Sequence, residues 1–176
     1  MKNNLLTVAS ILTLGFFTNS AIAQSNTVTA TTAGAEIASP IALSATGTLE
    51  FGSMYLTAAG TVTLNASTAA RTITGGVVLM TSGATPSTPQ FTVTGTADRT
   101  YAISLPTSIT VTEPGTTTMT IDNLKTYVAS VGDDTTTAGT LLTGSDTFKL
   151  GGILNVTGTQ VAGVYAGVYN VTVDYN

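Results

Sequence analysis

The chain has 176 residues, of which only 8% are charged, with a formal net charge of −4 and no Cys, His or Trp. The missing Cys and His exclude disulfides, ordinary zinc sites and histidine-based catalytic triads, and the sparse acidic charge argues against nucleic acid as a partner. About forty threonines favour extended structure, because β-branched side chains suit a pleated, half-buried surface.

Residues 1–23 have the three parts of a secretory signal peptide. Lys2 supplies the positive start, residues 5–17 form an apolar run, and residues 21–23 (AIA) match a cleavage site. Because the run is too short to span a bilayer comfortably, we expect cleavage and export. No second apolar run follows, so no transmembrane anchor is expected after cleavage. The mature protein would lie in the periplasm, on the cell surface or outside the cell.

The first part of the mature chain is small and polar. Residues 24–36 could form a free arm or a first edge strand, and a single domain is expected over residues 37–176. Alternation of apolar and polar residues predicts strands at residues 60–64 and 71–80. The pair Gly75-Gly76 interrupts the second strand and predicts a bulge or a bend there.

The middle of the chain predicts a hairpin followed by further short strands. Residues 90–95 and 100–105 should pair around a turn at residues 96–99. The side chains expected to point inward are Phe91, Val93, Tyr101, Ile103 and Leu105. Residues 131–139 have no apolar period and are predicted to form an exposed loop.

The last two predicted strands alternate most clearly. The penultimate strand should bury Phe148, Leu150, Gly152, Leu154 and Val156. The final strand, residues 163–176, places one aromatic and β-branched set on a single face. These residues are Gly163, Tyr165, Gly167, Tyr169, Val171, Val173 and Tyr175. We interpret the set as a candidate assembly edge.

Short strands separated by Gly, Pro, Asn and Asp indicate an all-β fold. The spacing favours an antiparallel β-sandwich with immunoglobulin-like topology, with a barrel as the alternative. No stretch of the mature chain has a helical period, and we find no internal repeat and no linker.

Few residues could carry chemistry. The acidic residues lie far apart and mostly in turns, and the chain lacks the Trp that sugar-cleaving enzymes commonly use for stacking. We therefore expect no enzyme and no cofactor. Asp133, Asp134 and Asp146 could offer oxygens to calcium, but they lack the ligand spacing of a known calcium loop, and a solvated loop is the simpler interpretation.

A series of segments, taken together, resembles one family. They are residues 49–52 (LEFG), 60–64 (GTVTL), 71–77 (RTITGGV), 91–95 (FTVTG), 100–106 (TYAISLP), 119–121 (MTI), 151–154 (GGIL) and 163–176. In this order they are similar to the bacterial secreted family known as domain of unknown function 4402, over nearly the whole mature chain. The resemblance implies an exported β-sandwich of Gram-negative bacteria without an established activity.

The final strand also resembles that of chaperone–usher pilin subunits. Gly163 is fourteenth from the end, Tyr175 is penultimate, and the positions between them alternate. The resemblance implies an edge that binds a periplasmic assembly chaperone and a sandwich completed by a strand of the next subunit. This chain departs from those pilins in having no disulfide and an arm that offers only Val28 and small residues.

Two functions follow as expectations. The first is an exported cell-surface structural or adhesive protein, a fimbria-like subunit that assembles through β-strand edges and has itself or a periplasmic chaperone as partner. The alternative is a secreted module that binds glycans or another surface as a monomer, through loops such as residues 131–139.

Overall fold

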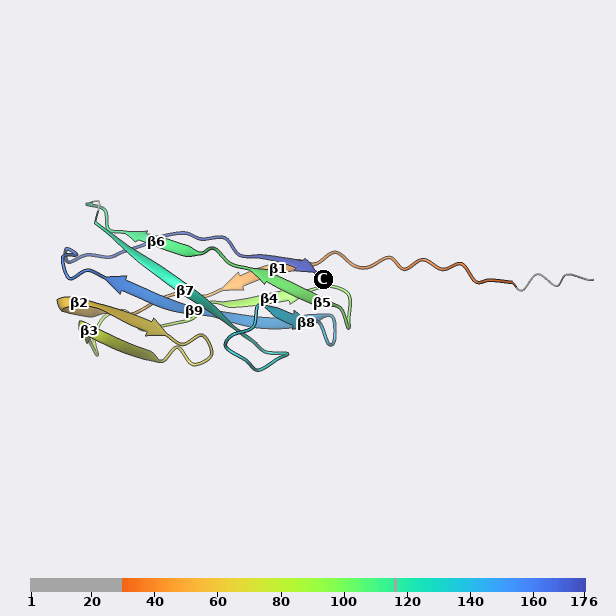
Figure 1. Ribbon diagram of the computed structural model, residues 1–176, viewed down its shortest axis with the longest axis horizontal. Helices are drawn as coiled ribbons and strands as arrows, with labels where there is room; N and C mark the ends of the chain where they lie inside the picture. The colour runs from red at the N-terminus through yellow and green to blue at the C-terminus, as the bar shows by residue number, and fades with distance from the viewer. Residues whose placement is uncertain (1–29, 116) are drawn as a thin grey trace, which may run out of the picture. The chain divides into compact units, whose positions relative to one another are not determined.

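The computed structural model describes residues 30–115 and 117–176 (Figure 1). The predicted signal peptide and residues 24–29 of the predicted arm lie outside the described residues. The chain divides into two compact units, residues 1–36 and residues 37–176. In the first unit, residues 30–36 are exposed and form neither helix nor strand. Every described strand belongs to the second unit.

The second unit is built from ten strands. They are β1 (Ala42–Thr46), β2 (Met54–Leu64), β3 (Arg71–Leu79), β4 (Gln90–Thr94), β5 (Thr100–Ser104), β6 (Ser108–Thr112), β7 (Thr118–Val128), β8 (Ala138–Thr140), β9 (Ser145–Val156) and β10 (Thr172–Tyr175). Among the described residues there is no helix long and apolar enough to cross a membrane.

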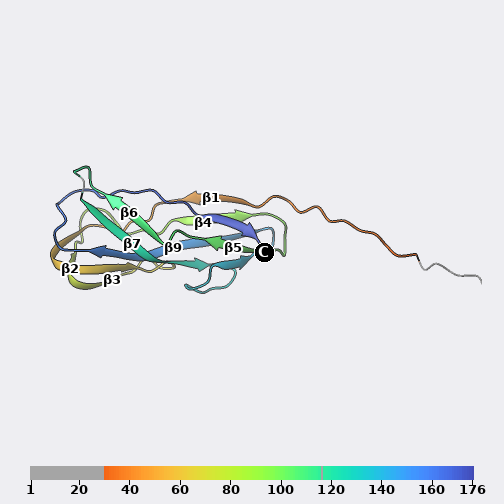
Figure 2. The same ribbon diagram turned by 45° about the horizontal axis from the view of Figure 1, so that its top comes forward.

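The strands form two antiparallel sheets (Figures 1 and 2). In the larger sheet β9 is central, with β7 along one edge and β4, then β2, along the other. β1 extends this sheet beyond β4, β3 extends it beyond β2, and β6 extends it beyond β7. The smaller sheet has the order β10-β5-β8. The predicted all-β antiparallel sandwich is therefore confirmed.

Two hairpins, β2–β3 and β6–β7, are added to an immunoglobulin-like framework. Without them, β1-β4-β9 lies in one sheet and β10-β5-β8 in the other. In an immunoglobulin domain the strands A, B and E share one sheet, and C, F and G share the other. Taken in chain order, β1, β4 and β9 correspond to strands A, B and E of one sheet. In the other sheet β5 corresponds to strand C and β10 to strand F. β8 pairs with β5 in the way that the additional strand C′ pairs with C in variable domains.

The predicted hairpin of residues 90–95 and 100–105 is wrong. β4 pairs with β1 and β9 in the larger sheet, whereas β5 pairs with β10 and β8 in the smaller one. The connection crosses between the sheets because other partners hold it: the Gly95 N–H donates to the Gly144 carbonyl at 2.9 Å, and the Asp98 N–H donates to the Leu141 carbonyl at 2.7 Å.

The inward residues were predicted correctly even where the strand partners were not. The buried set includes Phe91, Val93, Tyr101, Ile103, Phe148, Leu150, Leu154 and Val156. Phe91 and Phe148 face each other across β4 and β9 and stack with ring centroids 4.8 Å apart. Because both sheets turn one face inward, alternation within a strand predicts its buried side chains independently of its neighbours.

The glycine pair predicted to interrupt β3 lies opposite an irregular part of β2. The register between the two strands shifts between Leu56 and Gly60. Gly75 has a φ of +66°, and a Cβ there would lie 2.2 Å from the Ala59 carbonyl oxygen. Only glycine allows both this backbone conformation and this close approach.

One carboxylate, that of Asp146, lies inside the sandwich and is 8% exposed. Its Oδ1 accepts hydrogen bonds from the N–H groups of Ser130 and Thr147, at 3.1 and 2.8 Å. Its Oδ2 accepts from the hydroxyls of Ser130 and Tyr101, the latter at 2.9 Å. These bonds join the start of β9 to β5 and to the end of β7, so we assign Asp146 a structural role.

We expect the stability of the fold to decline in alkaline solution. Burial raises the pKa of Tyr101, and the hydrogen bond to Asp146 and its negative charge raise it further. A tyrosine with a raised pKa in the folded state contributes its full stability below about pH 10, the ordinary tyrosine value, and loses it as the pH rises further. Burial raises the pKa of Tyr169 in the same direction.

Urea unfolding of the wild type and of Tyr101→Phe tests this expectation. The wild-type midpoint should fall between about pH 8 and about pH 11, and the variant should show a shallower fall. An equal alkaline loss in both proteins would contradict the role of Tyr101.

Candidate functional site

The C-terminal segment runs antiparallel to β6 and then to β5. Ala166 forms an isolated bridge with Thr112 of β6, and β10 pairs with β5. The sequence predicted one strand over residues 163–176, but ladder pairing begins only at Thr172, and this correction has a physical cause. β5 and β6 are separated by Pro106, which has no N–H to donate, so the partner strand is itself interrupted.

The seven candidate residues do not share one environment. Tyr165, Tyr169, Val171, Val173 and Tyr175 are half-buried, whereas Gly163 and Gly167 are exposed. Tyr169 packs against both hydrophobic clusters of the core. A Cβ on Gly167 would lie 2.3 Å from the Thr110 carbonyl oxygen, so this glycine lets the segment approach the backbone of β6.

Tyr175 anchors the end of β10. Its hydroxyl accepts a hydrogen bond from the Thr96 N–H at 2.7 Å and donates one to the Ser39 carbonyl at 2.9 Å. The Ser39 N–H in turn donates to the Thr96 hydroxyl at 2.7 Å. These bonds bring the chain that leads into β1 next to the end of β10, although the two strands lie in different sheets.

The outer edge of β10 has no partner strand among the described residues. The Asn176 N–H donates to the Thr100 carbonyl at 3.2 Å. The backbone groups of the even-numbered residues of this segment, Thr172 and Asp174, therefore also face β5. Since backbone groups alternate in direction along a strand, Val173 and Tyr175 turn theirs toward the open edge. β10 has the position of strand F, and in an immunoglobulin sandwich strand G pairs with this edge of F. β1, beside it, also pairs on one edge only.

A groove of about 480 Å³ lies beside the C-terminal segment. Its two sides are the segment from Leu49 to Leu56 and the segment from Gly158 to Tyr165. The floor consists of the core residues Phe51, Ile121, Leu154 and Val156. Among the described residues that line the groove, Glu50 is the one acidic or basic residue. The groove therefore reaches down to the apolar core of the second unit, although its floor residues are only 3 to 6% exposed.

Apolar side chains also project from the rim of this groove. Val164 is 81% exposed, and Val161 and Tyr55 are exposed beside it. Exposed apolar groups around an unpaired strand edge are the features by which sheets recruit a further strand. Alternation could locate the C-terminal segment in the sequence, but it could not reveal this groove, because the opposite wall comes from residues about a hundred positions earlier.

The three aspartates considered for calcium accept hydrogen bonds from different protein groups. Asp146 is enclosed by protein donors, as described above, and Asp134 Oδ2 accepts from the Asn65 amide at 2.9 Å. Asp133 Oδ1 accepts from the N–H and the hydroxyl of Thr135, and these bonds lower the pKa of Asp133. No group of three metal-binding side chains occurs in the part of the chain that the structure describes.

Comparison with protein families supports the resemblance seen in the sequence. The family model described as domain of unknown function (DUF4402) matches residues 41–175. The chain belongs to this family. The match covers all ten strands of the sandwich, including the open edge of β10. Comparisons with curated proteins and with solved structures gave no significant match.

Proposed function

We propose that this member of the DUF4402 family is an exported, non-catalytic structural subunit of the cell surface that assembles through its strand edges. The open edge of β10 is the observation that carries the proposal, and the groove that reaches the core is lined by an earlier part of the same C-terminal segment, residues 158–165. An unpaired edge leaves backbone donors and acceptors available, and the exposed apolar side chains at the rim of the groove provide free energy when another strand covers them.

The N-terminal arm of another copy is the occupant that we propose for this edge. Residues 30–36 are exposed and form no strand, and Ile37 beside them is 96% exposed. An extended segment can provide a complete row of backbone groups, while its side chains enter the groove alternately. The arm brings few charges to an apolar surface, because Glu36 is the only charged residue among residues 24–37.

Light scattering after size exclusion tests the proposal with matched chains. The chain from residue 24 should form oligomers whose mass increases with concentration, whereas the chain from residue 37 should remain monomeric. A peptide of residues 24–37 should bind the shortened chain in a one-to-one ratio. Monomers at all concentrations for both chains would contradict assembly, and so would a cross-link that joins the arm to its own domain. An introduced cysteine pair can report that contact cleanly, since the chain has no other Cys.

Two exposed valines of the C-terminal segment provide a further control. Val164 lines the groove and Val168 does not, yet both are highly exposed, at 81% and 95%. Val164→Lys should prevent assembly, because it places a charge where the incoming strand would cover it. Val168→Lys should leave assembly unchanged. Equal effects of the two substitutions would argue against the groove as the contact surface.

A further inference from the structure

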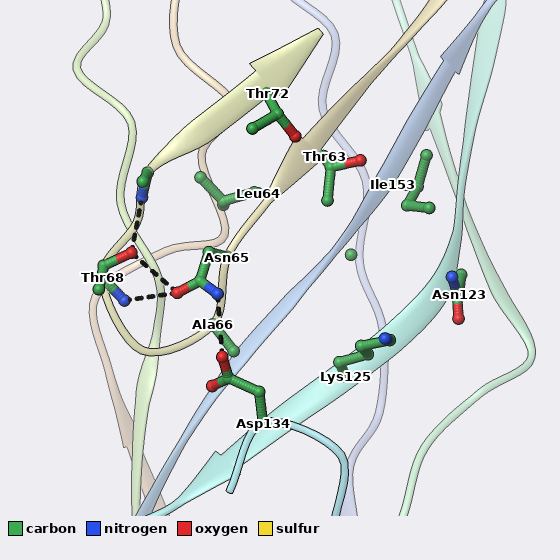
Figure 3. A pocket seen from close by; sticks show the side chains of 12 residues that line it. Thr63, Leu64, Asn65, Ala66, Thr68, Thr72, Asn123, Lys125, Asp134 and Ile153 are labelled. Atoms are coloured by element: carbon green, nitrogen blue, oxygen red, sulfur yellow. Dashed lines mark hydrogen bonds between the residues drawn. The ribbon is translucent and has the colours of Figure 1, made fainter. Parts of the chain in front are cut away.

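A second cavity, of about 450 Å³, lies on the outer face of the larger sheet (Figure 3). Thr63 of β2 pairs with Thr72 of β3 on one side and with Ile153 of β9 on the other, and all three line the cavity. Thr63 and Ile153 each lie between two buried residues of their strands, so they and the exposed Thr72 beside Thr63 belong to the face that points away from the core. No residue lines both this cavity and the groove.

The loop between β2 and β3 forms one wall of the cavity and is held rigidly. Asn65 Oδ1 accepts hydrogen bonds from the N–H and the hydroxyl of Thr68, at 2.9 and 2.8 Å. The Asn65 N–H donates to the Ala70 carbonyl at 2.9 Å. The Asn65 amide donates to Asp134 Oδ2 at 2.9 Å, which ties this loop to the loop that follows β7. The wall is thus formed before any ligand arrives.

Two residues with a positive φ lie at this cavity, Asn123 in its lining and Ala69 in the loop that forms its wall. Only three described residues other than glycine have a positive φ, and two of them are Asn123, at +45°, and Ala69, at +56°. Asn123 lies where the register of β7 against β9 shifts, between Asp122 and Lys125. Bulges and strained backbone are common where side chains are directed toward a binding site. Figure 3 shows Asn123 and Lys125 together on one side of the cavity, opposite Asn65 and Asp134.

The cavity contains both an acceptor and a donor without protein partners. Asp134 Oδ1 is buried and has no hydrogen-bond partner in the described structure. The Lys125 side chain is exposed, and its ammonium forms no hydrogen bond or ion pair with any described residue. The hydroxyls of Thr63 and Thr72 can donate or accept, and Ile153, beside Thr63 in the sheet, provides an apolar surface.

We propose that this cavity binds a neutral saccharide of one or two sugar units. A sugar hydroxyl can donate to the carboxylate of Asp134 while a neighbouring hydroxyl accepts from the ammonium of Lys125, and the C–H face of the ring can pack on Ile153. An anion would meet the carboxylate of Asp134. A divalent cation would find only the carboxylate of Asp134 among the described lining residues, whereas such ions commonly bind several oxygen ligands. The site is separate from the proposed assembly edge, so either proposal can fail without the other.

Saturation-transfer NMR of the chain from Gln24 onward tests the site. The probes are glucose, galactose, N-acetylglucosamine, maltose and lactose, each titrated to about 10 mM. At least one sugar should bind with a millimolar dissociation constant. Lys125→Met and Asp134→Asn should each weaken that binding about tenfold, since each removes a charge-assisted hydrogen bond. Thr72→Val should weaken it less, and Thr110→Val, an exposed threonine of the same sheet outside the cavity, should not change it.

Three results would overturn the proposal. The first is the absence of binding for every sugar. The second is binding that Lys125→Met and Thr72→Val leave unchanged, which would place the sugar elsewhere. The third is thermal stabilisation by calcium chloride but by no sugar, which would assign the cavity to a cation. Circular dichroism of each variant verifies that it is folded, and Lys125 and Thr72 are exposed enough for their substitution to be tolerated.

Discussion

Replacing Asp146 by Ala should lower the free energy of unfolding by about 3 to 5 kcal/mol, because four buried or half-buried donors lose the carboxylate that accepts their hydrogen bonds. In a domain of this size the melting temperature should fall by about 10 °C or more. Asp146→Asn should have an intermediate effect, since its amide keeps one oxygen for the Ser130 and Thr147 N–H groups but loses the charge.

Chemical denaturation followed by circular dichroism measures this loss. Asp174→Ala is the matched control, because Asp174 is an exposed aspartate of β10 and its removal should change stability by less than about 0.5 kcal/mol. A loss below about 1 kcal/mol for Asp146→Ala would show that the network contributes little. The assignment of Asp146 as a structural residue would then be wrong.

Gly151→Ala should destabilise the domain by about 3 kcal/mol or more. A Cβ at this position would lie 2.3 Å from the Leu64 carbonyl oxygen and 2.7 Å from the Ala66 N, and both are backbone atoms. Gly151 lies in β9 between the part that pairs with β4 and the part that pairs with β2. Relieving the clash would therefore separate β9 from the end of β2.

Two other glycines provide graded controls for this substitution. At Gly152 the nearest atom to a new Cβ would be Leu124 Cδ2, at 2.9 Å, which is the end of a flexible side chain. Gly152→Ala should therefore cost less than Gly151→Ala. Gly34 has no atom within 4 Å of a new Cβ, so Gly34→Ala should be neutral. Urea midpoints of the three variants should follow this order, and a neutral Gly151→Ala would show that β9 can move away from β2.

The buried faces of the strands could be predicted because they depend on local alternation alone. The inward side of β9 was predicted from Phe148 to Val156, and these residues are buried. The same alternation of inward and outward side chains extends back to Asp146, two residues before Phe148. This alternation was the feature of the sequence that could have predicted a buried carboxylate at Asp146. The sequence interpretation grouped Asp146 with the loop aspartates, because an acidic residue is rarely buried without partners and those partners are distant in sequence.

Strand neighbours could not be predicted in the same way. β4 and β5 are close in the chain and both alternate, yet they lie in different sheets, because residues 141–144 bind the connection between them. Alternation records which side chains are buried and does not record which strand lies alongside. The polar cavity had no sequence signal either, since Asn65, Lys125 and Asp134 meet only through the folding of three separate segments.

The sequence by itself determined the all-β class and the inward face of most strands. Each depends on the period of a single strand, which side-chain chemistry sets locally. Only the tertiary structure decided that β10 lies at an open edge next to β1, and that a groove beside residues 158–165 reaches the core. An edge is open because no neighbour covers it, and neighbours are chosen by contacts between residues far apart in the chain.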